Sequence, residues 1–160
     1  MNARDAIKLS IDTGNMISMM YLEDMSDKEL MHRPCPGCNH INWQIGHLIV
    51  SDHGMGNTLT SGSMPELPAG FEAKYSKETA AIDDPSKFCT KAELLAVYKA
   101  QRDAALAALA KTSEADFDKA TGVDYAPTVG AMFSLLGSHW LMHCGQWAVV
   151  RRELGRKPIF

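Results

Sequence analysis

The sequence lacks several features that would place it in a large class of proteins at once. No uninterrupted apolar run reaches the roughly 18 residues that a membrane-spanning helix needs, and Met1–Asp5 does not begin the pattern of a secretion signal. The net charge is −3, the pI is about 6.0, and the only tight group of cations lies in residues 151–157. We therefore expect a cytoplasmic protein that binds neither a membrane nor nucleic acid, because phosphate binding needs clustered lysine and arginine.

Cysteine is also scarce, with four in the chain: Cys35, Cys38, Cys89 and Cys144. A chain of 160 residues buries a core without covalent links, and a reducing compartment would not keep disulfides, so we expect none. The motif Cys35-Pro-Gly-Cys38 leaves two alternatives open, a redox or zinc site before a helix or two incidental small residues in a turn. The second is favoured, because no strand precedes the motif and no second such motif follows.

Helix signals divide the chain into four long segments, and no segment has the pattern of a strand. The predicted helices run from Ala3 to Leu22, from an N-cap at Asn39 to about Thr60, onward from the capping box Thr90–Glu93, and from about Thr128 to Leu154. Gly155 and Pro158 then mark the end of the last helix. The chain is therefore predicted to be all-α.

The link between the second and third predicted helices, residues 61–89, is unusually long. Short links join antiparallel neighbours, whereas a link of this length can cross a whole bundle. We predict a single domain over residues 1–160, a four-helix bundle with one long crossover between helices 2 and 3, and parallel middle helices.

Histidines on two of these helices are the candidate ligands. His139 and His143 are four residues apart and lie on or beside an apolar stripe of the last helix, where two imidazoles can reach one metal ion. His47, on the second helix, is the candidate third ligand. Spacing alone leaves open the alternative that these are hydrogen-bonded core residues, and His40, which shares a face with His47, is the substitute ligand.

Three further residues are candidates for the surroundings of the metal. Gln146 lies on the flank of His139 and is predicted to hydrogen-bond to a ligand. Trp43, one turn before His47, is predicted to form an apolar wall and orient its ring. Ser51 lies with small residues in a strip beside His47, which leaves space for a ligand. His32, His40 and His53 are predicted to be surface or loop residues.

Two blocks of the sequence resemble the DinB/YfiT-like superfamily. The first is Arg33–Leu48, with its Trp-x-x-Gly-His-Leu core, and the second is His139–Gln146, which reads His-x-x-x-His-x-Gly-Gln. The resemblance implies an up-down-down-up four-helix bundle with a divalent metal on three histidines, here matching His47, His139 and His143. It also implies a homodimer, and some relatives are transferases or isomerases that use the thiols mycothiol or bacillithiol.

Three functions follow as hypotheses. The first is a metal-dependent enzyme on a small molecule, with zinc, nickel or iron activating a low-molecular-weight thiol, as in an S-transferase or isomerase, or a water molecule, as in a hydrolase. The absence of an acidic residue beside the ligands favours the thiol. The second is redox or zinc chemistry at Cys35 and Cys38. The third is a non-catalytic metal-binding or stress-response protein.

Overall fold

Four long helices make up most of the chain in the computed structural model, which describes all 160 residues. They are α1 (Ala3–Leu22), α3 (Ile41–Leu59), α5 (Lys91–Lys111) and α6 (Val129–Glu153). The connections contain two single-turn helices, α2 (Asp27–Leu30) and α4 (Phe71–Lys74), and 3₁₀ turns at Lys77–Thr79, Pro85–Lys87 and Glu114–Asp116. No strand forms, and one isolated bridge joins Ala120 to Thr128. The all-α prediction is confirmed.

The helices begin at residues whose side chains can accept a hydrogen bond from the first turn. The capping box of Thr90 with Glu93 forms as predicted, and the Asn2 side chain caps α1 by accepting from the backbone N–H of Asp5 at 2.8 Å. The N-cap of α3 is His40, not the predicted Asn39. Nδ1 of His40 accepts a hydrogen bond from the backbone N–H of Trp43 at 3.0 Å. It therefore caps the helix as the side-chain oxygen of a serine or aspartate would.

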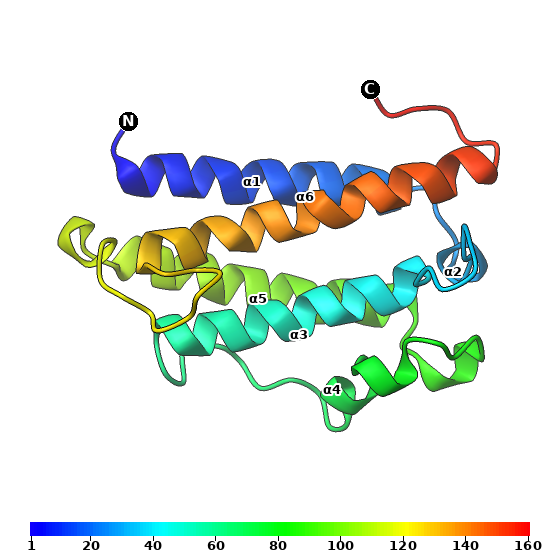
Figure 1. Cartoon of the computed structure of the whole chain (residues 1–160), viewed down its shortest axis with the longest axis horizontal. Coiled ribbons are helices and arrows are strands. Elements are labelled where there is room, and N and C mark those ends of the chain that lie inside the picture. Colours follow the sequence, from blue (N-terminus) through cyan, green and yellow to red (C-terminus); the bar gives the residue numbers. More distant parts are fainter.

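The bundle has the predicted path. Helices α1 and α6 run in one direction, and α3 and α5 run in the other (Figure 1). The crossover, residues 60–90, returns along the outside of the bundle and carries α4, so that α5 can start at the same end as α3 (Figure 1). The up-down-down-up topology, with one long crossover, is therefore the observed one, and it places α3 and α6 antiparallel.

Helix α6, which carries two of the candidate ligands, is packed directly on the backbone of α1. A Cβ atom at Gly137 would lie 2.5 Å from the backbone oxygen of Ser10, and one at Gly14 would lie 2.7 Å from the backbone oxygen of Gly137. Because the atoms in the way are backbone and not flexible side chains, only glycine fits at these two positions. The two helices are consequently held at close range just before His139.

A buried ion pair links three of the helices. Arg102 of α5 donates from Nη2 to Oδ2 of Asp52 on α3 at 2.8 Å, and Trp140 of α6 donates from Nε1 to the same oxygen at 2.9 Å. Asp52 and Arg102 are 1% and 4% exposed. The guanidinium lies 5.4 Å from the ring centroid of Tyr98 and 5.7 Å from that of Trp140. We call Asp52, Arg102 and Trp140 the ion-pair cluster.

The loop before α3 differs from the expectation that no cysteines pair. Cys35 and Cys38 form a disulfide, with their Cα atoms 5.3 Å apart. The reason is a tight turn, in which Gly37 has a φ of 80° and the N–H of Cys38 donates to the carbonyl of Cys35. Arg33 fixes the loop to the crossover through hydrogen bonds to the carbonyls of Cys38, Ala80 and Ile82. None of the helices combines the length and the apolar character needed to cross a membrane.

Candidate metal centre

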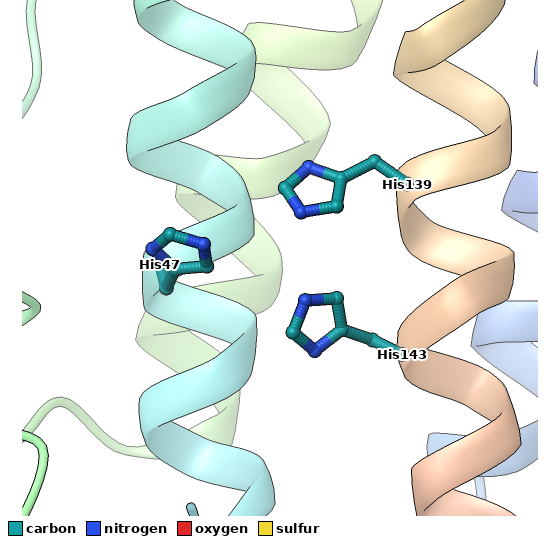
Figure 2. A group of neighbouring side chains, drawn as sticks. All are labelled: His47, His139 and His143. Atoms are coloured by element: carbon teal, nitrogen blue, oxygen red, sulfur yellow. The ribbon is translucent and has the colours of Figure 1, made fainter. Parts of the chain in front are cut away.

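The fold brings the three predicted ligands together. His47 extends from the middle of α3 toward α6, where His139 and His143 face it from successive turns (Figure 2). One ring nitrogen of each histidine lies within 4.8 Å of the chosen nitrogens of the other two. The ring centroids are 5.7 Å apart for His47 and His139, 5.9 Å for His47 and His143, and 5.1 Å for His139 and His143. Three imidazole nitrogens at this spacing can bind one metal ion. We call His47, His139 and His143 the histidine cluster.

Gln44 fixes the protonation of His143. Oε1 of Gln44 lies 2.8 Å from Nδ1 of His143 and accepts a hydrogen bond from Nε1 of Trp147 at 2.9 Å. An indole N–H can only donate, so the shared atom of Gln44 is the acceptor oxygen, and Nδ1 of His143 must carry the proton. The Gln44 amide nitrogen donates in turn to the carbonyl of Asn39 at 2.7 Å. The lone pair on Nε2 of His143 is therefore free for a metal.

Trp43 lies one turn before His47 on α3 and packs against its ring. The two rings are stacked with an interplanar angle of 4° and a centroid distance of 5.1 Å. Trp43 is itself held by the crossover, because its Nε1 donates to the carbonyl of Ser76 at 3.2 Å and to Oγ1 of Thr79 at 3.1 Å. The crossover thus restrains the candidate ligand His47 through Trp43.

All three imidazoles favour the neutral form. Burial lowers the pKa of His143 to about 4, with further lowering by His139 and His47. Burial also lowers the pKa of His47, followed by the charge of Lys77, and the pKa of His139, followed by His47. Because a metal binds only an unprotonated ring nitrogen, the cluster is ready to bind a cation at neutral pH.

A groove between α3 and α6 opens onto the histidine cluster, with a cavity volume of about 730 Å³. His47 and His139 line it, whereas His143 lies beneath and is 7% exposed. The groove has four small or hydroxyl-bearing residues, Ser51, Gly54, Thr58 and Ser138. Its apolar walls are Met55, Met132, Leu135, Met142 and, from the loop between α5 and α6, Val123 and Tyr125. We call this hollow the α3–α6 groove.

Of the other predicted site residues, the structure places one in the groove and the others outside it. Ser51 lines the groove one turn after His47. Gln146 is exposed and forms no hydrogen bond with any of the three histidines. The side-chain amide beside His143 is that of Gln44. His40 is not a ligand and not a surface residue: it is fully buried, with Nδ1 capping α3 and Nε2 3.2 Å from the carbonyl of Ile82.

The remaining histidines make structural contacts outside the cluster. Nε2 of His32 pairs with Glu153 at 2.8 Å, and His53 contacts Gln101 and Asn57 at 3.2 and 3.1 Å. Sequence reasoning missed Gln44 and the groove residues Val123 and Tyr125. Neither Gln44, whose partners His143 and Trp147 lie on another helix, nor the loop residues gave a signal in the sequence.

Comparison with known proteins agrees with this geometry. The model of the DinB superfamily matches residues 11–147, a span that includes all three members of the histidine cluster. No curated protein and no solved structure matches the chain. The extent of the match, together with the four-helix bundle and its three-histidine cluster, shows that the chain belongs to the DinB superfamily.

Proposed function

We propose that this DinB-superfamily chain is a metal-dependent enzyme that acts on a small molecule, with zinc, nickel or iron on the histidine cluster. One observation carries the proposal: three imidazoles present ring nitrogens to one point beside an open groove, and no fourth side chain completes the set. Three protein ligands and a vacant position are typical of catalytic metal sites, whereas structural sites have four protein ligands.

The surroundings favour attack by a thiolate over attack by water. A bound divalent metal lowers the pKa of a thiol or water and stabilises the anion. The groove lining contains no aspartate or glutamate to accept a proton from water. The acidic residues of the two ligand helices are Asp52, which is sealed in the ion-pair cluster, and Glu153, which pairs with His32. We therefore propose a thiol-dependent transferase or isomerase with a low-molecular-weight thiol as cosubstrate.

The chain's own residues would hold the reacting centre rigidly. Gln44 keeps the Nε2 lone pair of His143 toward the cluster, and the Trp43 ring restrains His47 by stacking. His143 already has the tautomer that a metal needs, and both ligands favour the neutral form, so neither must release a proton to bind a cation at neutral pH. The reorganisation is thus small when a metal or substrate arrives.

The proposal is tested by elemental analysis of the purified, untagged protein and by titration with zinc, nickel and iron. We expect about one metal ion per chain, and a His143→Ala variant that binds at least a hundredfold more weakly, beyond the 10–100-fold effect usual for residues that support a ligand. His32→Ala, which removes a histidine paired with Glu153 at 2.8 Å, serves as the matched control and keeps the wild-type affinity.

Two results would argue against the proposal. A protein that refuses all three metals, or that binds them equally well without His143, has no metal centre at the cluster. A protein that holds its metal but turns over no substrate in a panel of thiols with halide, epoxide and maleyl acceptors favours the non-catalytic metal-binding alternative.

A further inference from the structure

The α3–α6 groove indicates which molecules the proposed enzyme accepts. Resting on the proposed metal-dependent function, we infer that the substrate has an extended, uncharged apolar portion, which lies along the groove while its reacting group meets the histidine cluster.

The groove carries no charged side chain. None of its lining residues is aspartate, glutamate, lysine or arginine, and half are hydrophobic. A charged group on the part of the substrate that lies along the groove, away from the metal, would have to leave water with no opposite charge on a lining side chain, which costs free energy. The lining therefore disfavours a charge on the portion of the substrate that lies along the groove.

The shape of the groove is elongated, with the cluster near one end. Thr58 lies eleven positions after His47 on α3, which corresponds to about 16 Å at the rise of an α-helix. The opposite wall is built by α6 from Met142 back to Met132. A cavity volume of about 730 Å³ is within the range of small-molecule sites. An alkyl or aryl portion bound there would replace water on the flexible methionine side chains, which adapt to irregular apolar shapes.

The rim supplies an apolar cover. Tyr125, in the loop between α5 and α6, is 75% exposed, and Met142 is 58% exposed, yet both line the groove. Large apolar side chains left in water beside a groove would lose that exposure when an apolar ligand enters, and burial of this surface favours binding.

Gly54 offers a direct way to test the occupant. It lines the groove on α3, and a Cβ atom added there would meet no atom within 4 Å, so Gly54→Leu would fill the groove without straining the helix. Gly145 on α6 is the matched control, since it is also exposed and helical with open space around its Cβ position, but lies outside the groove. Both substitutions replace a helical glycine by a better helix former.

The experiment titrates cobalt-substituted protein with a series of 1-alkanethiols from propanethiol to hexanethiol. Binding is read from the thiolate-to-cobalt charge-transfer band. We expect affinity to rise two- to fourfold with each methylene group in the wild type and in Gly145→Leu. The gain should vanish in Gly54→Leu, which still binds cobalt. Thioglycerol, a hydrophilic thiol of similar length to butanethiol, should bind more weakly than butanethiol.

The outcomes separate the two levels of the argument. If thiols reach the cobalt but affinity does not depend on the alkyl chain, or if thioglycerol binds as well as butanethiol, the inferred substrate class is wrong and the metal-dependent function stands. If the chain-length gain survives in Gly54→Leu, the apolar portion lies outside this groove and the inference is also wrong. If the protein binds no cobalt at the histidines, the proposed function itself fails.

Discussion

Helices α3 and α6 are joined by two clusters of polar side chains, and the clusters differ in almost every property. The ion-pair cluster is charged and sealed from solvent, with Asp52 and Arg102 1% and 4% exposed. The histidine cluster is uncharged at neutral pH, opens on the α3–α6 groove and presents ring nitrogens to a common point. Both use a neighbouring indole: Trp140 donates to Asp52, and Trp147 donates to Gln44 behind His143.

The difference shows how one pair of helices separates stability from chemistry. Burying an ion pair is costly, and removing one member strands the other charge, so the ion-pair cluster locks α3, α5 and α6 in register. Burial still raises the pKa of Asp52 to about 6, even though Arg102 and the Trp140 hydrogen bond oppose this shift. Neutral imidazoles, in contrast, can remain without a ligand at little cost. The cluster proposed to bind a cation is thus the one that the stability of the fold depends on less.

Removing the arginine of the ion-pair cluster should have the largest effect on folding. Arg102→Met leaves Asp52 buried without its partner, and we expect a loss of about 3–5 kcal/mol in the free energy of unfolding. Urea denaturation of the metal-free protein measures it. Arg152→Met, at an exposed position of α6, is the control and should change stability by less than about 0.5 kcal/mol. Folded Arg102→Met should still bind one metal ion; loss of metal from folded protein would show that the clusters are not separable.

Removing the support of His143 should have an intermediate effect on metal binding. Gln44→Met deletes the oxygen that accepts from His143 and Trp147, so we expect metal affinity to fall about 10–100-fold in a competition titration with a zinc chelator. Gln44→Glu, which restores an acceptor oxygen, should recover most of it. Gln146→Met is the control at an exposed glutamine of the same helix as His143. Equal affinities of Gln44→Met and the wild type would contradict the assigned tautomer of His143.

The smallest effect concerns acid sensitivity, which compares a structural histidine with the ligands. Burial lowers the pKa of His40, as it does that of His143, in each case to about 4. Between pH 6.5 and about 4 the unfolded chain binds protons that the folded histidines refuse, so the stability of metal-free protein should fall as the pH falls through this window. Asp52, with its raised pKa, acts in the opposite sense but is one group against four histidines.

His40→Asn separates the contributions of these histidines. Asparagine keeps a cap for α3 but loses the contact with the carbonyl of Ile82, which costs about 1 kcal/mol at pH 8. The fall in stability from pH 6.5 to 4 should become shallower, measured by urea denaturation at several pH values. Metal affinity at pH 8 should not change. An unaltered pH dependence would mean that His40 does not titrate in this range.

Local signals in the sequence were sufficient for the fold. The Thr90–Glu93 box, the cap at Thr128 and the glycine at 155 mark ends of helices through contacts within one turn, and the structure places ends there. The length of residues 61–89 was enough to predict the crossover, because a link that long can cross the bundle. The N-cap of α3 was misplaced by one residue because histidine is not among the usual capping residues, although its unprotonated nitrogen accepts in the same way.

Only those site residues that a pattern within a single helix identifies could be predicted from the sequence. His139 and His143 follow from a four-residue spacing. His47 was a candidate from its place beside small residues on the second helix, and the resemblance of Trp43–Leu48 to the family motif supported it. Gln44 could not be assigned, since its partners His143 and Trp147 are about a hundred residues away and meet it only through interhelical packing. Helical periodicity places Gln146 on the same side of α6 as His139. It does not show how much of that side is covered by a neighbouring helix, and in the structure Gln146 is exposed to solvent.

The contact between Gly14 and Gly137 has a consequence for anyone who redesigns this bundle. The distance between α1 and α6 is set there by direct contact of the two backbones, because a Cβ atom added at Gly137 would lie only 2.5 Å from the backbone oxygen of Ser10 on α1. A single methyl group at this spot would push α6 outward two residues before His139. Helix α1 could therefore not be exchanged for one from another bundle, or broadened for stability, without retuning the gap between His47 and the ligands on α6.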